Sequence, residues 1–378
     1  MTGFWRALLV DSRSPDLWRS LYLLRRRRVA FVSSQFGTLR HTCEHGREQL
    51  AMWGIGATVM RVEELTLPED LQPFDLVVLN RVPASIRLEQ ALREISTRGG
   101  VVVGDLDDML LDAEVVLSHP YYREQPLAVR KHLTELAEGL RRTFTLCSHV
   151  LCYTVALETE LVRCGYRPLR VTSCASNEML ACARQARELV RSEPGVVTLG
   201  FAAGHPGHIA NLAVALGALE NLLDELPTCR LVLLGGLEPP RELRRFGERV
   251  ECRPYVDWRE LPREICRFDV AIAPLVTCAF NRGKSHLKYI EAALCRVPLV
   301  ASPVGQLGET IRDGVNGRLA RTTEEWVSCL RELAQSPELR HRLGTRSHTH
   351  VVRELTTRAC APVLVRALGR AVRERIRP

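Results

Sequence analysis

Long apolar runs and paired cysteines are missing from this sequence. In 378 residues, no apolar stretch approaches the ~18–20 residues that a membrane-spanning helix needs. Residues 1–10 lack a basic segment before their short apolar stretch, so we expect no cleaved signal peptide. The chain has 13 cysteines but no Cys-x-x-Cys pair, which argues against a zinc site. Because Cys152 and Cys295 lie inside apolar runs, we expect reduced, buried thiols in a cytoplasmic protein.

Aromatic residues are also scarce, at 6% of the chain, and none is interleaved with the basic runs. The net charge of +8 is concentrated in Arg25–Arg28 and in residues 366–377. Single-stranded nucleic acid is held by aromatic stacking beside positive charge, so we expect no nucleic-acid partner. An apolar and aromatic set precedes Arg25–Arg28 and permits either contact with an anionic membrane or docking on the N-terminal domain. It comprises Trp5, Leu8, Leu9, Trp18, Leu21, Tyr22 and Leu24.

Short Val- and Leu-rich runs alternate with helical patterns, which is typical of parallel sheets covered on both faces. The expected strands are 28–33, 74–79, 100–104, 150–153, 169–172, 196–201, 230–234, 270–274 and 297–301, and the expected helices include 86–95, 209–225 and 285–294. The polar break Ser192–Gly195 near the middle predicts a domain boundary. We therefore expect an α/β fold of two Rossmann-like βαβ domains facing a cleft, with ligands at the carboxyl ends of the strands.

The predicted helix 285–294 carries a polar cluster at its start. Lys284, Lys288 and Glu291 are spaced by four and three residues, which places them within a ~60° arc of a helix face. Helix N-termini attract phosphate, and a carboxylate accepts hydrogen bonds from ribose hydroxyls. The spacing fits a nucleoside diphosphate site, but it fits equally an exposed helix with a Lys288–Glu291 ion pair.

Six further segments follow one another in a fixed order. They are GFAAGHPGH, LVLLGG, VECRPYVDWRELPREICRFDVAIAPL, FNRGKSHLKYIEAAL, VPLVASPVG and ETIRDGVNGRLA. In this order, residues 197–352 resemble the group 1 glycosyltransferases (glycosyltransferase family 4) of the GT-B fold. The resemblance implies an acceptor domain over 1–192, a nucleotide-sugar donor domain over 196–355, and a C-terminal helix in 356–378 that returns to the N-terminal domain.

The resemblance also implies roles for single residues. Glu291 matches the carboxylate that binds ribose, Lys284 and Lys288 match diphosphate contacts, and the loop at Tyr255 matches the segment that holds the base. The residues expected to bind the donor are Gly204, His208, Tyr255, Asn281, Lys284, Ser285, Lys288 and Glu291. Gly283 departs from the family pattern, because a glutamate that contacts the donor sugar usually stands there. We expect the polar side chain of Asn281 to contact the donor sugar in place of that glutamate.

In the N-terminal half, the loop after the first strand supplies the expected acceptor contacts Gln35, Phe36, Gly37 and Arg40. Asp107 and Asp108 follow the strand 100–104 and belong to an Asp-x-Asp-Asp sequence seen in some relatives. The sequence leaves three roles possible for these aspartates: binding a metal, contacting the acceptor or capping a helix, and acting as a general base. We name His208, Asp107 and Asp108 as catalytic candidates, with His119 and His45 as further bases, and expect no metal and no cofactor.

The predicted activity is the transfer of a hexose from a nucleotide diphosphate sugar to a hydroxyl acceptor, without a metal. The expected acceptor is a sugar or a lipid-linked sugar. The expected setting is the synthesis of a surface polysaccharide or glycoconjugate. The expected location is the cytoplasm, with peripheral contact at the inner membrane face. Two other functions fit the same fold: a nucleotide-sugar epimerase or hydrolase, and a non-catalytic scaffold module. The Gly283 departure favours the scaffold.

Overall fold

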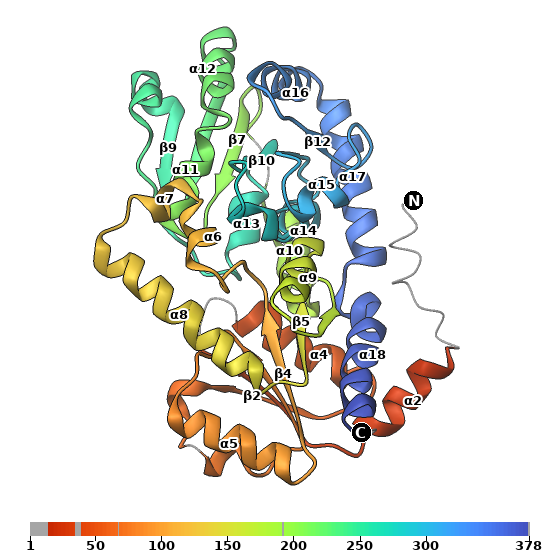
Figure 1. Cartoon of the computed structure of the whole chain (residues 1–378). Helices are drawn as coiled ribbons and strands as arrows, with labels where there is room; N and C mark the ends of the chain where they lie inside the picture. Colours follow the sequence, from red (N-terminus) through yellow and green to blue (C-terminus); the bar gives the residue numbers. More distant parts are fainter. Residues whose placement is uncertain (1–13, 35–38, 67, 191–192, 377–378) are drawn as a thin grey trace. The chain divides into compact units, whose positions relative to one another are not determined.

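The computed structural model describes residues 14–34, 39–66, 68–190 and 193–376 (Figure 1). The chain divides into two compact units. Unit 1 comprises Met1–Ser118, Arg123–Ser176 and Glu354–Pro378, and unit 2 comprises His119–Tyr122 and Asn177–Arg353. The domain limits inferred from the sequence stay a prediction.

Unit 1 contains a parallel sheet of six strands in the order β2-β1-β3-β4-β5-β6. The strands are β1 Val29–Ser33, β2 Ala57–Arg61, β3 Leu76–Asn80, β4 Val101–Leu106, β5 His149–Cys152 and β6 Pro168–Arg170. Every residue of β1, β3 and β4 is buried, because helices cover both faces of the sheet. Val29 and Phe31 belong to one core cluster, and the alternate residues Ala30 and Val32 belong to another.

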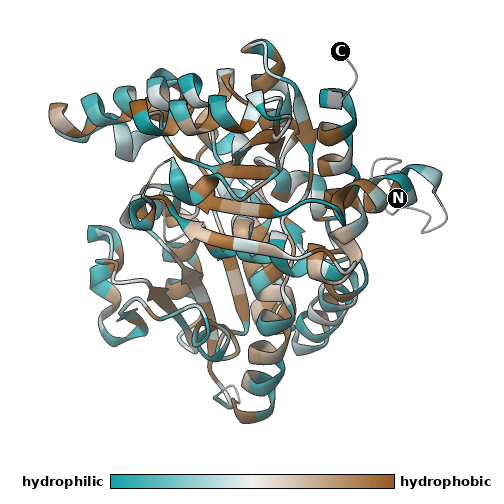
Figure 2. Cartoon of the chain, turned by 90° about the horizontal axis from the view of Figure 1, so that it is seen from below, coloured by the Kyte–Doolittle hydropathy of each residue, from teal (hydrophilic) through white to brown (hydrophobic). Residues whose placement is uncertain are grey.

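Helices from both ends of the chain cover one face of this sheet. They are α2 (Pro15–Leu24), α4 (His45–Ala51) and α18 (Thr357–Ile376), and α5 (Ile86–Thr97) packs on the other face. Gly369 of α18 permits close contact with α2, since a Cβ there would come within 2.3 Å of the Ser20 side chain. The other helices of the unit include α6 Ala113–Leu117, α8 Leu127–Thr145 and α9 Val155–Arg163. In Figure 2 the strands are largely brown and the helices mix brown with teal, as expected for buried strands and amphipathic helices.

Unit 2 contains a second parallel sheet, in the order β12-β11-β10-β7-β8-β9. Its strands are β7 Val197–Ala202, β8 Cys229–Leu234, β9 Val250–Arg253, β10 Val270–Ala273, β11 Leu299–Ala301 and β12 Arg318–Leu319. Read from β9, the order is the 3-2-1-4-5-6 arrangement of the Rossmann fold. The accompanying helices include α10 Asn177–Leu189, α11 Ile209–Leu212, α12 Leu216–Glu225, α13 Leu261–Ile265, α14 Leu287–Leu294, α15 Gln306–Thr310, α16 Thr323–Gln335 and α17 Pro337–Glu354.

The α/β prediction with two Rossmann-like sheets is confirmed. The strands that the sequence did not predict are β2, β9 and β12, which all lie at or beside a sheet edge and are only partly buried. The prediction of one helix over 209–225 is wrong, because α11 ends at Leu212 and a turn separates it from α12. The Ser336 hydroxyl accepts a hydrogen bond from the Leu339 N–H at 3.1 Å and so caps α17.

Candidate functional site

In unit 2, the strand order reverses between β7 and β10, which are neighbours in the sheet. In open parallel sheets, ligands bind outside the carboxyl ends of the strands at such a point. Residues 203–208 follow β7 and residues 274–286 follow β10. These two loops carry five of the predicted donor residues: Gly204, His208, Asn281, Lys284 and Ser285.

The loop after β7 is open at Gly204 and ordered by a neighbouring histidine. A Cβ added to the exposed Gly204 would meet no atom within 4 Å, so another molecule can approach this backbone closely. The Gly207 N–H donates to His205 Nδ1 at 3.0 Å, and the N–H of the half-buried His208 donates to the His205 carbonyl at 3.0 Å. Partial burial and then the positive charge of Lys284 lower the pKa of His205, which favours the neutral ring.

The loop after β10 is held by a buried amide that the sequence did not single out. Asn211 Oδ1 accepts hydrogen bonds from the Val276 N–H at 3.0 Å and from Asn281 Nδ2 at 2.8 Å. Asn281 Nδ2 also donates to the Val276 carbonyl at 2.9 Å, and the Asn281 residue is 0% exposed. The structure therefore encloses Asn281, the predicted sugar contact, within the loop. A polar Asn211 inside the apolar run IANLAVAL was the signal that the sequence offered.

Lys284 precedes α14 and is not part of it. The predicted helix 285–294 begins at Leu287, because residues before it form a tighter turn that the Lys284 N–H closes on the Asn281 carbonyl at 3.1 Å. The Lys284 carbonyl accepts from the Gln306 N–H at 2.9 Å and so takes no part in the helix. The prediction that Lys284, Lys288 and Glu291 share one helical face is therefore wrong for Lys284. Only Lys288 and Glu291 share the helix.

Two contacts fix the position of Lys284. Its ammonium nitrogen lies 4.4 Å from the centroid of the Phe280 ring, within the range of a cation–π contact. Gly305 packs closely against the same loop with φ +58°, and a Cβ there would lie 2.5 Å from the Lys284 carbonyl oxygen. Both the positive φ and the close approach require glycine at position 305.

On α14, Lys288 and Glu291 form an ion pair with 2.9 Å between Nζ and Oε2, while the Lys288 side chain remains 29% exposed. Tyr289 and Ile290 on the same helix are fully buried. Tyr255 lies after β9 and is 65% exposed. Gly235, with φ +125°, brings the end of β8 against the loop after β7, since a Cβ there would lie 2.2 Å from the Ala203 carbonyl oxygen.

In unit 1, the strand order reverses between β1 and β3, and Arg81 follows β3 directly. Its guanidinium contacts Asp107 at 2.5 Å and Asp108 at 3.6 Å. Although burial opposes its charge, these two carboxylates raise the pKa of Arg81. Arg81 has φ +51°, a left-handed conformation that costs a non-glycine residue energy and often marks functional sites. The two predicted catalytic aspartates thus lie in one ion-pair cluster that holds this strained residue.

Asp105 is the buried carboxylate of the same sequence, at 1% exposure. Its Oδ2 accepts a hydrogen bond from the Tyr153 hydroxyl at 3.1 Å. Burial, and after it the charge of Asp107, raises the pKa of Asp105 well above its usual range, which favours the protonated acid. Of the predicted acceptor contacts, Gln35, Phe36 and Gly37 lie outside the described residues, and Arg40 is half-buried beside His41.

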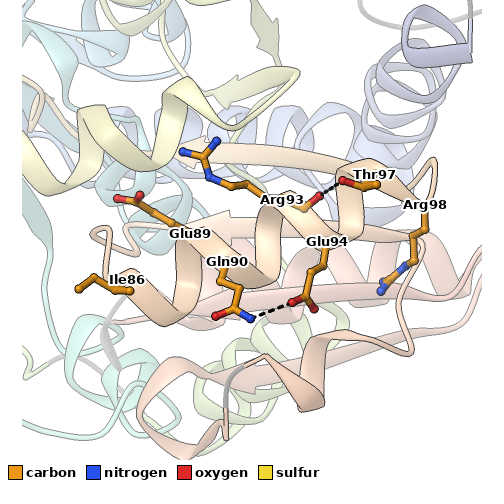
Figure 3. Close-up of a pocket in the computed structure, with 7 residues that line it drawn as sticks. All are labelled: Ile86, Glu89, Gln90, Arg93, Glu94, Thr97 and Arg98. Carbon is orange, nitrogen blue, oxygen red and sulfur yellow. Dashed lines mark hydrogen bonds between the residues drawn. The ribbon is translucent and has the colours of Figure 1, made fainter.

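A hollow of about 570 Å³ lies elsewhere, along the exposed side of α5 (Figure 3). It is lined by Ile86, Glu89, Gln90, Arg93, Glu94, Thr97 and Arg98. Gln90 donates to Glu94 at 3.0 Å, and the Thr97 hydroxyl donates to the Arg93 carbonyl at 2.9 Å, so the lining is the polar face of one helix. None of the predicted site residues lines it. Among the described residues, no group of three or more His, Cys, Asp or Glu side chains is placed to hold a metal ion.

We predict that two isosteric changes in the acidic cluster of unit 1, Asp105→Asn and Asp107→Asn, have different effects on the stability of the fold. Since the folded-state pKa of Asp105 is raised, its contribution to stability is complete below its unfolded-state pKa and is lost as the pH rises through the folded-state value. Asp105→Asn should therefore match or exceed wild-type stability at pH 7.5, with the difference vanishing near pH 3. Asp107→Asn, which weakens a charged hydrogen bond to Arg81, should lose about 2 kcal/mol at pH 7.5. Urea unfolding at the two pH values measures both. A loss of stability in Asp105→Asn as large as that in Asp107→Asn would contradict the account.

Comparison with known proteins places the sequence match in unit 2. Residues 194–336 match the family model described as Glycosyl transferases group 1. The D-inositol 3-phosphate glycosyltransferase of Streptomyces coelicolor is 29% identical over 154 residues, which are 36% of this chain and 33% of that protein. The match thus spans about a third of the curated relative's length.

Solved structures match the fold over most of the chain. Sucrose-phosphate synthase from Thermosynechococcus elongatus has a TM-score of 0.61 at 16% identity, with 89% of this chain and 96% of that chain covered. Anabaena HepE in complex with UDP-glucose has a TM-score of 0.55 at 15% identity, with 93% and 99% covered. At these identities the likeness concerns the fold. The chain therefore has the GT-B fold, and through residues 194–336 it resembles the group 1 glycosyltransferases.

Proposed function

We propose that this chain is a glycosyltransferase that moves a sugar from a nucleotide diphosphate sugar to a hydroxyl acceptor. One observation carries the proposal. The exposed Gly204 follows β7 and the fixed Lys284 follows β10, and the strand order of this Rossmann-type sheet reverses between these two strands. Both residues lie inside residues 194–336, the stretch that matches the group 1 family. The curated relative is a glycosyltransferase, and HepE was crystallised with UDP-glucose, which supports UDP-sugars as the first donors to test. We further propose a hexose as the transferred sugar and surface polysaccharide or glycoconjugate synthesis as the setting.

The donor would be held by charge and backbone groups without a metal. Breaking the bond to the sugar leaves negative charge on the diphosphate, and the Lys284 ammonium and the first N–H groups of α14 stabilise such charge. His208 and Ser285 would add hydrogen bonds to phosphate oxygens. Glu291 would accept hydrogen bonds from the ribose hydroxyls, with Lys288 holding its carboxylate, and the loop at Tyr255 would hold the base. Because Asn281 is buried, we assign it to positioning the loop rather than to contact with the sugar.

On the acceptor side we propose Asp107 as the group that takes the hydroxyl proton. Its contacts with Arg81 and with Asn80 both fall on Oδ1, so Oδ2 can accept a further hydrogen bond. Asp108 would share the charge of Arg81 and keep Asp107 oriented. Gln35, Phe36, Gly37 and Arg40 stay proposed acceptor contacts.

The proposal predicts sugar transfer from UDP-glucose, or from a GDP-, dTDP- or ADP-sugar, that persists in EDTA. Glu291→Gln should weaken donor binding about tenfold, because it loses charged hydrogen bonds to the ribose worth about 1.4 kcal/mol. Glu242→Gln, an exposed change in the same unit, is the control and should bind normally. Calorimetry and a transfer assay with sugar and lipid-linked acceptors measure both effects. Activity abolished by EDTA would contradict metal independence. Donor turnover without acceptor would indicate an epimerase or hydrolase, and a folded protein that binds no nucleotide would indicate a scaffold.

We also propose that the protein works in the cytoplasm, in peripheral contact with an anionic membrane through α2. Leu17, Leu21 and Leu24 of α2 are buried in the core of unit 1. Trp18 and Tyr22 are 55% and 58% exposed, and Arg26 lies 4.2 Å from the centroid of the Tyr22 ring. Exposed aromatic rings beside arginines suit the interface between lipid headgroups and acyl chains. Among the described residues, no helix is long and apolar enough to span a membrane.

This surface predicts selective binding to vesicles that contain phosphatidylglycerol over vesicles of phosphatidylcholine alone. The double change Trp18→Ala and Tyr22→Ala should reduce the bound fraction severalfold at unchanged thermal stability, because both rings are exposed. Val162→Ala, an exposed apolar change on α9, is the control. Equal flotation of wild type and double variant with the anionic vesicles would contradict the role of α2.

A further inference from the structure

Four residues from the N-terminal half of the chain belong to unit 2. The 119–122 segment, His119–Tyr122, lies between α6 and α8 of unit 1 in chain order and overlaps the short helix α7 (Pro120–Arg123) (Figure 1). The chain thus leaves unit 1 after Ser118, contributes to unit 2, and returns at Arg123. All contacts described below lie within unit 2.

His119 reaches the buried amide that holds the loop after β10. It is 2% exposed, and its Nε2 lies 3.2 Å from Asn211 Oδ1. The same oxygen accepts from Val276 and from Asn281. Since Asn211 Oδ1 can only accept, His119 must carry its proton on Nε2 and donate it. One oxygen therefore joins the 119–122 segment to the loop that carries Lys284.

The two tyrosines of the segment contact both loops at the strand reversal. The Tyr121 ring centroid lies 5.5 Å from that of His205, and Tyr122 lies 5.3 Å from Phe280. Phe280 is the ring over which the Lys284 ammonium is placed. On the other loop, a Cβ added to Gly207 would come within 2.8 Å of the Tyr121 ring, so the packing there is close.

We infer that the 119–122 segment is a positioning part of the donor site, in which His119 and Tyr122 set the place of the Lys284 ammonium and hence the affinity for the donor diphosphate. The inference rests on the proposed function. It means that the donor site of unit 2 is incomplete without residues supplied from within the acceptor half of the sequence. His119 thereby changes from a candidate base to a positioning residue, because its Nε2 proton is committed to Asn211.

The experiment compares His119→Gln with His119→Leu in the full chain. Glutamine places an N–H donor where the His119 Nε2–H lies, whereas leucine fills the space without a donor. With UDP as the probe, and GDP, dTDP and ADP beside it, we expect His119→Leu to raise the Kd about tenfold, as loss of a buried hydrogen bond implies, and His119→Gln to stay within about threefold of wild type. Tyr122→Ala should also raise the Kd severalfold, and Tyr122→Phe should not.

His348→Leu, a change at a half-buried histidine on α17, is the matched control for the loss of an imidazole. It should lower thermal stability without changing the Kd. A purely structural role for His119 would likewise lower the melting temperature and leave the Kd of the folded protein unchanged, and that result would overturn the inference. If His119→Leu does not fold, unchanged affinity in Tyr122→Ala would overturn it in the same way. Wild-type protein that binds none of the four nucleotides would instead overturn the proposed function.

Discussion

The arrangement of the candidate donor site depends on one buried oxygen, Asn211 Oδ1. It accepts three hydrogen bonds, from His119, Val276 and Asn281, and so fixes the loop between β10 and α14 against α11 and the 119–122 segment. A buried amide oxygen that lost these donors would keep its desolvation cost without compensation. The position of Lys284, the proposed diphosphate contact, follows from this constraint and from the close approach of Gly305.

In both sheets, polar loops lie where the strand order reverses, but the two sets of loops carry different charged and polar residues. In unit 2 the loops carry an exposed glycine, a histidine with a lowered pKa and a lysine, a set suited to an anion. In unit 1 the corresponding place holds Arg81, which pairs with Asp107 and Asp108, and the same strand end carries the buried Asp105, whose pKa is raised by burial. Because two carboxylates face one guanidinium, this cluster repels phosphate and suits hydroxyl groups, which agrees with the proposed donor site in unit 2 and the proposed acceptor site in unit 1.

The sequence predicted every strand that is buried along most of its length, and also the partly buried edge strand β6. β1, β3, β4, β7 and β8 are rich in Val, Leu and Phe and mostly buried, whereas β2, β9 and β12 are partly exposed. Among the site residues, the Lys288–Glu291 spacing predicted a real contact. Lys284 was misplaced because periodicity cannot show that its carbonyl bonds to Gln306, which is distant in sequence. The partners Asn211 and Arg81 were missed for the same reason, since each acts through contacts that are distant in sequence.

A crystal structure of the protein with UDP tests the central claim most directly. We expect ribose hydroxyls at about 3 Å from the Glu291 carboxylate, and diphosphate oxygens at hydrogen-bond distance from the Lys284 ammonium and the backbone of residues 204–208. UDP bound away from both loops, with the Lys288–Glu291 pair unchanged and distant from the ribose, would contradict it.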